Sequence, residues 1–257
     1  MVATPRDAAT LILVRNDGQS LDGFEVLLLR RHVKSEFMPD AYVFPGGTIE
    51  TEDYDQQVET ICQGLNFQQA HDVIPDIYPP EKALGSFVAA IRETFEEAGI
   101  ILAYRKAIDL LAIGEEEKIP LNKYRKQIRR EPFSFLSTIK EAGLKLAVGN
   151  LHYFAHWITP EILPMRFDTR FFIAVAPLNQ NAIKDAMEVT DHIWVKPQRV
   201  LKEQELGLSL PFPTLSNMKV LAQFSSVDEL ITSTLDKKVP TIQPTVTIEN
   251  GEMKIRI

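Results

Sequence analysis

Residues 92–99 read RETFEEAG and close the clearest helical pattern in the chain. The segment ends at Gly99, and helices very often stop at a glycine. Four apolar side chains recur at helical spacing along one side of the predicted helix: Val88, Ile91, Phe95 and Ala98. This periodicity predicts an amphipathic helix over residues 87–98, with its apolar side packed against the rest of the protein.

Three glutamates share the other side of this helix. At 100° per residue, Glu93, Glu96 and Glu97 gather opposite the apolar side chains. Like charges at this spacing repel by roughly 0.2–0.5 kcal/mol per pair, and Glu96 and Glu97 also lie at the negative end of the helix dipole. A bound divalent cation would reverse both penalties, because carboxylate oxygens suit Mg²⁺ or Mn²⁺. The alternative interpretation is a solvated helix surface.

Arg92 stands next to this acidic group. It lies one residue before Glu93 and four before Glu96, so its guanidinium can pair with a glutamate and fix the orientation of that side chain. The alternative is an ordinary surface ion pair, worth about 0–1 kcal/mol.

The composition restricts the class of protein. The chain has 257 residues, with 35 acidic and 28 basic side chains and a net charge of −7, whereas a general nucleic-acid binder needs a basic surface. Its single cysteine, Cys62, excludes an internal disulfide scaffold or a cysteine-rich zinc site and fits a reducing compartment. No apolar run reaches the roughly 18 residues of a membrane helix, and the N-terminus does not read as a signal peptide. We expect a cytoplasmic protein without nucleic-acid or membrane partners.

Strand patterns flank the helix on both sides. Residues 8–15 and 24–30 predict a hairpin with turn chemistry at residues 16–18. Residues 41–44 predict a short strand, closed by a turn at residues 45–47. The other strand patterns, including a last hairpin around Asn250-Gly251, cover residues 151–158, 170–176, 188–195 and 245–257.

Helical and irregular patterns fill the rest of the chain. Residues 51–85 read as a loop with one short helix, and residues 105–142 read as a helical excursion. Ser226 and Glu229 have the spacing of a capping box. Further helices are expected at residues 197–207, 214–224 and 227–235. This order of elements predicts one α/β domain over residues 1–257, elaborated by helical insertions.

Two of these segments together resemble the Nudix box. FPGG at residues 44–47 stands ahead of RETFEEAGI at residues 92–100. The family pattern is a glycine, five residues, a glutamate, seven residues, then Arg-Glu-apolar-x-Glu-Glu-x-Gly-apolar. The second half matches at every fixed position except Thr94. In the first half the count from Gly47 reaches Asp53, with Glu50 and Glu52 nearby, and 38 residues instead of seven then precede Arg92.

The resemblance implies a fold and an activity. The expected fold is the Nudix fold, a mixed β-sheet sandwiched between α-helices, with an insert at about residues 54–86 inside the box. The expected activity is hydrolysis of a nucleoside diphosphate linked to another group, with Mg²⁺ or Mn²⁺ held by Glu93, Glu96 and Glu97 and with Arg92 as a catalytic partner. Gly46 and Gly47 would bring the backbone close to the substrate.

A long insert inside the box is similar to that of one subgroup, the peroxisomal-type coenzyme A diphosphatases. The similarity extends to residues 37–39, 156–160 and 166–172. This subgroup implies cleavage of coenzyme A or acyl-coenzyme A to adenosine 3′,5′-bisphosphate and a phosphopantetheine product. The simpler coenzyme A signature of other Nudix enzymes agrees with the chain at Leu27, Leu28 and Arg31, and differs from it at Leu29, Glu36 and Asp40.

The sequence leaves alternatives for the residues that bind the substrate and for the residue that takes the proton from water. Strand alternation sends Arg30 and Arg31 to opposite faces, and Arg31 is our candidate for holding a phosphate, against the alternative of a solvated side chain. The water-activating base is one of the box glutamates or, outside the box, Glu188. Residues 207–224 either line a channel for the pantetheine or acyl group or pack against the core.

Several candidate sites are excluded. His152 and His156 lie about 13 Å apart along a predicted strand, too far to share one ion. Cys62 has no evident catalytic partners, and we interpret it as a buried or loop thiol. The competing functions are a Nudix pyrophosphatase for ADP-ribose, a nucleotide sugar or a dinucleotide, and a non-catalytic Nudix-fold binding protein. A homodimer is the one open expectation about protein partners.

Overall fold

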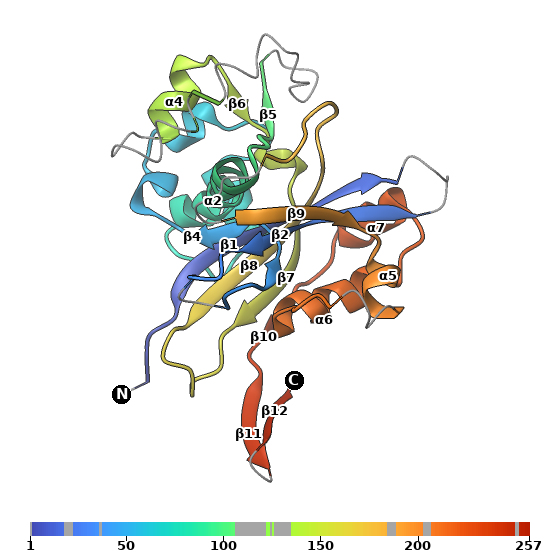
Figure 1. Ribbon diagram of the computed structural model, residues 1–257. Coiled ribbons are helices and arrows are strands. Elements are labelled where there is room, and N and C mark those ends of the chain that lie inside the picture. Colours follow the sequence, from blue (N-terminus) through green and yellow to red (C-terminus); the bar gives the residue numbers. More distant parts are fainter. Residues whose placement is uncertain are drawn as a thin grey trace.

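A mixed eight-stranded sheet forms the centre of the protein (Figure 1). The computed structural model describes residues 2–17, 23–35, 38–105, 122–123, 125, 135–183, 189–202, 207–249 and 252–257. The strand order is β10-β7-β8-β1-β2-β3, with β4 paired to β1 and β9 paired to β2. The strands of this sheet are β1 (Arg6–Asn16), β2 (Phe24–Arg31), β3 (Tyr42–Val43), β4 (Gly46–Thr48), β7 (His152–Ile158), β8 (Phe167–Val175), β9 (Val189–Val195) and β10 (Thr241–Ile242).

Strand β1 lies inside this sheet. It forms the predicted antiparallel hairpin with β2 and runs parallel to β8 along most of its length. Residues 11–14 of β1 are an unbroken apolar run with 0% exposure, as expected for a strand covered on both faces. Of the predicted turn, Gly18 lies outside the described residues.

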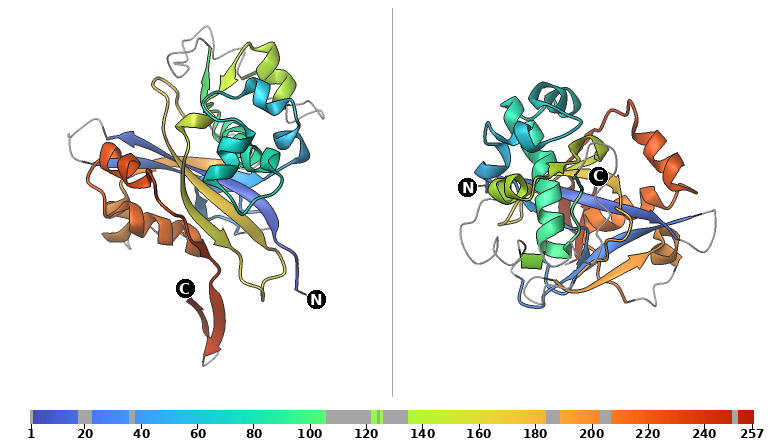
Figure 2. Two further views of the ribbon diagram at one scale, coloured as in Figure 1. Left: turned by 180° about the vertical axis from the view of Figure 1, so that it is seen from behind. Right: turned by 90° about the horizontal axis from the view of Figure 1, so that it is seen from above.

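Helices cover both faces of the sheet, as Figures 1 and 2 show. Helix α2 (Pro80–Ala98) packs on the face that carries the odd-numbered residues of β1, such as Leu11 and Leu13. The opposite face carries Ile12 and Val14. It is covered by the helices α5 (Pro197–Lys202), α6 (Phe212–Leu221) and α7 (Val227–Thr234). The mixed sheet between helices is the fold that the sequence predicts.

The glycine pair after β3 departs from its predicted turn. Gly46 and Gly47 begin strand β4 and pair with Thr10 and Ala9 of β1. A side chain on Gly46 would place its Cβ 2.5 Å from the carbonyl oxygen of Ala9, so glycine is needed here for close strand approach rather than for a turn.

The insert inside the box contains more helix than the sequence predicts. It begins with η1 (Thr51–Tyr54) and continues through η2 (Val58–Ile61) and α1 (Phe67–Val73). Helix α2 then starts at Pro80, seven residues before the predicted start at residue 87. Proline is favoured at the first position of a helix because it lacks the amide hydrogen that would be left unpaired there. The prediction of a mostly irregular loop was therefore wrong.

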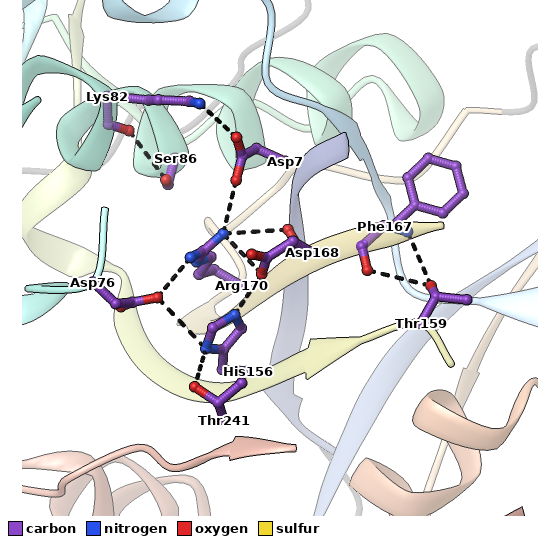
Figure 3. A network of polar contacts seen from close by, with 10 residues as sticks. All are labelled: Asp7, Asp76, Lys82, Ser86, His156, Thr159, Phe167, Asp168, Arg170 and Thr241. Atoms are coloured by element: carbon purple, nitrogen blue, oxygen red, sulfur yellow. Dashed lines mark hydrogen bonds and ion pairs between the residues drawn. The ribbon is translucent and has the colours of Figure 1, made fainter. Parts of the chain in front are cut away.

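An ionic network fixes the insert to the sheet (Figure 3). Arg170 of β8 is 3% exposed and donates to Asp76 of the insert at 2.6 Å. The same guanidinium reaches Asp7 of β1 at 3.0 Å and Asp168 at 2.9 Å. Asp7 in turn pairs with Lys82 near the start of α2. Aspartates from three separate chain segments thereby meet at one buried arginine.

The second insertion is described only in part. Strands β5 (Ala103–Tyr104) and β6 (Lys145–Leu146) form a two-stranded sheet, and α4 (Phe135–Glu141) precedes β6. A short helix, η3 (Val148–Asn150), follows. Most of the helical excursion predicted over residues 105–142 lies outside the described residues.

The C-terminal part largely follows its predicted pattern. Ser226 caps α7 by accepting from the Glu229 amide, but the Glu229 carboxylate accepts from Ser225 instead of closing the predicted capping box. Strands β11 (Thr245–Glu249) and β12 (Glu252–Arg256) pair as a hairpin that projects from the body of the molecule (Figures 1 and 2). Its predicted turn, Asn250-Gly251, lies outside the described residues. No helix among the described residues is long and apolar enough to cross a membrane.

Candidate active site

Two glutamates of α2, Glu93 and Glu97, pack against strand β4, and none of the three faces open solvent. The side chains of Glu93 and Glu96 are 14% and 20% exposed, and Glu97 is 7% exposed. Thr94 on the same helix is fully buried, and its hydroxyl donates to the Ala90 carbonyl. The helix is therefore enclosed on more sides than its apolar stripe predicts, and the interpretation of the glutamates as a solvated surface was wrong.

Arg92 organises the polar contacts of this site. Its Nη1 atom lies 2.8 Å from Glu93 Oε1 and 3.4 Å from Glu96 Oε1. Its Nη2 atom donates to the carbonyl of Thr48 at 2.9 Å. The residue is 8% exposed, so the surface ion pair considered for it is excluded. Arg92 instead joins two glutamates to the end of strand β4.

Asp53 completes the coordination of the Arg92 guanidinium. The Nε and Nη2 atoms of Arg92 donate to the two Asp53 oxygens at 2.8 and 2.9 Å, in the bidentate geometry that makes such pairs strong. Asp53 is 1% exposed and also accepts from the Glu50 amide. The neighbouring Glu52 accepts from the Leu136 amide. The spacing of the box points to Asp53 without indicating its role. In the structure Asp53 is the bidentate partner of Arg92.

The glycine pair lets the helix come close to β4. The amide of Gly46 donates to Glu97 Oε2 at 3.0 Å. A Cβ added to Gly47 would lie 2.5 Å from the Cδ and Oε1 atoms of Glu93. The structure therefore brings together Arg92, the three glutamates and both glycines predicted from the sequence.

Burial makes this cluster electrostatically costly when no cation is present. Desolvation raises the pKa of Glu93 to about 7; the charge of Arg92 opposes the rise, and the charge of Glu96 adds to it. Burial alone would lower the pKa of Arg92, but its hydrogen bond to Asp53 and the surrounding carboxylates raise it. Arg92 is therefore always charged and offsets only part of the negative charge around it.

The donor chemistry fits a hard divalent cation. Three carboxylates lie on the last turns of one helix, and oxygen ligands of this kind are the ones that Mg²⁺ and Mn²⁺ prefer. Throughout the described ranges, no three acidic, histidine or cysteine side chains already converge as a ready-made metal cluster. Glu93 and Glu96 instead contact Arg92, and Glu97 contacts the Gly46 amide.

Arg31 is not a member of the Arg92 network. It ends β2 on the face of Leu27 and Leu29, which belong to the core beneath α2. Its Nε atom is buried and has no hydrogen-bond partner among the described residues. Arg30, on the opposite face, forms a two-pronged pair with Asp40. The predicted division of the two arginines between the faces agrees with these contacts.

The remaining candidates are distributed as follows. Glu188, the candidate base outside the box, lies outside the described residues. Within the segment 207–224, helix α6 contributes Met218 and Leu221 to the core, which favours packing over a channel lining. His156 contacts Asp168 and Thr241. Burial raises the pKa of Cys62 to about 12, consistent with an inert thiol.

Arg125 is the residue of the site that sequence reasoning missed. It is 7% exposed and donates to the backbone carbonyls of Glu96 and Glu97. It lies in a stretch predicted only as helical, with no motif around it, and no signal in the sequence connects it to the glutamates.

Comparisons with known proteins identify the family of this chain. A family model described as NUDT19 Nudix domain matches residues 5–218. Acyl-coenzyme A diphosphatase NUDT19 of Xenopus laevis is 30% identical over 243 residues, which cover 84% of this chain and 64% of that protein. The human protein of the same name is 26% identical over 239 residues, covering 81% of this chain and 63% of its own. The chain thus spans just under two thirds of the length of these relatives.

A solved structure supports the same fold. The crystal structure of a Nudix hydrolase from Alicyclobacillus acidocaldarius has a TM-score of 0.71 with 23% sequence identity and covers 90% of this chain and 97% of its own. At this identity the similarity concerns the fold alone, and it agrees with the sheet between helices described above. Because the family model spans most of the residues, the chain belongs to the NUDT19 Nudix family.

Proposed function

We propose that this chain is a Mg²⁺- or Mn²⁺-dependent diphosphatase that cleaves coenzyme A or acyl-coenzyme A. The products would be adenosine 3′,5′-bisphosphate and phosphopantetheine or its acyl derivative. The relatives named acyl-coenzyme A diphosphatase support this substrate class. The observation that carries the proposal is the arrangement of three largely buried glutamates on the last turns of α2, where Arg92 contacts Glu93 and Glu96 and the Gly46 amide donates to Glu97.

The glutamates would hold the metal. Nudix hydrolases generally need a divalent cation, and Glu93, Glu96 and Glu97 are the residues of this chain that would bind it. When bound, such a cation neutralises diphosphate charge, orients the attacking water and stabilises the leaving phosphate. The raised pKa of Glu93 follows from burial of its carboxylate, and a nearby cation would favour the charged form.

The other residues of the site position these groups. Arg92 fixes the orientation of Glu93 and Glu96 through its fixed donor geometry. The Gly46 amide orients Glu97. Arg31 would bind a phosphate of the substrate, because its buried Nε is a donor that needs an acceptor. The base that takes the proton from water is one of the glutamates or Glu188.

A hydrolysis screen tests this proposal. Coenzyme A esters, ADP-ribose, a nucleotide sugar, a dinucleotide and a nucleoside triphosphate are each incubated with Mn²⁺ or Mg²⁺, and the product masses identify the bond that breaks. The coenzyme A esters are expected to turn over fastest. Turnover of another nucleotide together with none of the coenzyme A esters would contradict the proposed substrate.

A glutamate double variant separates an enzyme from a binding protein. Replacing Glu96 and Glu97 by Gln keeps the side-chain shape but removes both charges, so the metal should bind weakly and most activity should be lost. Glu81→Gln, in the first turn of the same helix, is the matched control and should keep its activity. Unchanged function in the double variant would favour the non-catalytic alternative. The predicted cytoplasmic location and homodimer stay predictions.

A further inference from the structure

All four of the last backbone carbonyls of helix α2 have a hydrogen-bond donor. The last four carbonyls of an α-helix have no partner inside the helix. In α2 the Phe95 carbonyl accepts from the Gly99 amide at 2.9 Å, and the Ala98 carbonyl accepts from the Ile183 amide at 2.8 Å. The side chain of Arg125 donates hydrogen bonds to the other two carbonyls, those of Glu96 and Glu97.

Arg125 serves these two carbonyls with separate nitrogens. Its Nε donates to the Glu96 carbonyl at 2.8 Å, and its Nη2 donates to the Glu97 carbonyl at 2.7 Å. The same Nη2 lies 3.2 Å from the Ile183 carbonyl. The two carbonyls belong to two of the three proposed metal-binding residues, so one guanidinium holds the backbone of both.

Gly99 leaves the space that the Arg125 guanidinium occupies. Gly99 has a φ of 71°, and a Cβ added there would lie 3.1 Å from Arg125 Nη1. Glycine therefore satisfies both the left-handed cap and the approach of the guanidinium. Arg125 also brings a permanent positive charge to the negative end of the helix dipole, where Glu96 and Glu97 add further negative charge.

We propose that Arg125 is a positioning residue for the metal site, fixing the last turn of α2 so that the Glu96 and Glu97 carboxylates are held ready for the cation. This inference rests on the proposed function for the assignment of these glutamates as ligands.

The test compares Arg125 with an arginine of similar burial elsewhere. Arg125→Met keeps an unbranched side chain of comparable length but removes the donors. Arg166→Met is the matched control, because Arg166 is also 7% exposed and donates to backbone carbonyls, those of Thr159 and Ala3. Arg125→Lys keeps the charge but lacks the planar fork.

Two readouts need no turnover. Binding of Mn²⁺ alone, followed by electron paramagnetic resonance, should weaken roughly 10–100-fold in Arg125→Met and remain as in the wild type in Arg166→Met. Amide hydrogen exchange should accelerate in the last turn of α2 in Arg125→Met, with the first turns still protected. Arg125→Lys should also bind Mn²⁺ weakly. Wild-type affinity in this variant would contradict the claim that the planar guanidinium, rather than the positive charge, positions the helix end.

Different results would contradict the role of Arg125 and the proposed metal site. Equal weakening of Mn²⁺ binding in Arg125→Met and Arg166→Met would overturn the positioning role, since it would reflect general destabilisation. Unchanged exchange in the last turn would overturn it as well. A wild-type protein that binds no Mn²⁺ would instead contradict the proposed metal site, whereas the exchange experiment would still report whether Arg125 holds the helix end.

Discussion

Asp53 and Arg92 lie 39 positions apart in the chain and form a two-pronged ion pair in the structure, with N–O distances of 2.8 and 2.9 Å. The pair joins η1, at the start of the insert, to helix α2. Asp53 is 1% exposed and Arg92 is 8% exposed. The insert therefore lengthens the chain between the two halves of the box without separating the residues that must meet.

Replacing Asp53 by Asn should impair both stability and activity. The amide cannot accept from both guanidinium nitrogens, so Arg92 would be left buried with part of its charge unpaired. Removing one partner of a buried pair costs about 3–5 kcal/mol, and retention of a neutral acceptor in Asn places the expected loss at about 2–4 kcal/mol. Urea unfolding gives the stability, and the metal-dependent rate gives kcat.

The control for this variant is Glu52→Gln. Glu52 neighbours Asp53 in η1 but accepts from the Leu136 amide rather than from Arg92. The Glu52→Gln substitution should reduce the free energy of unfolding by about 1 kcal/mol and leave kcat near the wild-type value. Equal kcat values in the two variants would contradict the positioning of Arg92 by Asp53.

Alanine at Gly47 should act on the site, whereas alanine at Gly46 should act on the fold. The added Cβ at Gly47 meets the carboxylate of Glu93, but at Gly46 it meets the backbone of β1 at Ala9 and Thr10. Gly47→Ala should thus lower metal affinity roughly tenfold with little loss of stability. Titration of Mn²⁺ and thermal unfolding distinguish the two variants, and normal Mn²⁺ binding by Gly47→Ala would contradict the close packing of Glu93 on β4.

The ionic network of Figure 3 predicts a pH dependence of stability. Burial alone would raise the pKa of Asp168, but His156 and Arg170 lower it below its ordinary value of 3.8. A lowered folded-state pKa means that the stabilising contribution is present above about pH 4 and is lost as the pH falls through the folded-state pKa. Asp168→Asn should therefore cost about 1–2 kcal/mol at pH 7.

Chemical denaturation at several pH values tests this sign. The difference in unfolding free energy between the wild type and Asp168→Asn should stay constant above about pH 4 and shrink as the pH falls below about 4. A difference that grows in acid would show that the pKa of Asp168 is raised rather than lowered in the folded protein.

Cys62 should react slowly with thiol reagents in the folded protein. Burial, together with the charge of Glu59, raises the pKa of its thiol to about 12. The thiolate fraction at pH 8 is then roughly a thousandfold smaller than in an unfolded chain. Absorbance of released thionitrobenzoate, compared with and without denaturant, measures this ratio, and equal rates would contradict the raised pKa of Cys62.

The sequence predicts the elements with strong local patterns and misses those that depend on distant contacts. Residues 87–98 are helical because their apolar side chains repeat every three or four positions, and the β1–β2 hairpin follows from its apolar strands. The glycine pair is in a strand rather than a turn because β1 lies beside it, and no local pattern encodes that neighbour.

The site shows the same division. Glu93, Glu96 and Glu97 could be identified from their spacing on one helix, and Arg92 from its position beside them. Their burial could not be predicted, because strand β4 packs against Glu93 and Glu97 and no periodicity within α2 reports that partner. Arg92 also donates to the backbone carbonyl of Thr48. Every residue type has this carbonyl, so such a contact cannot be predicted from the sequence.

The most direct measurement is identification of the products when one acyl-coenzyme A is hydrolysed with Mn²⁺ in ¹⁸O-labelled water. We predict two products, adenosine 3′,5′-bisphosphate and acyl-phosphopantetheine, with one ¹⁸O atom in a phosphate of one of them. No product should form without the metal or in the variant with Glu96→Gln and Glu97→Gln. Absence of turnover by the wild type, or release of a free acid and intact coenzyme A by thioester cleavage, would contradict the proposed diphosphatase.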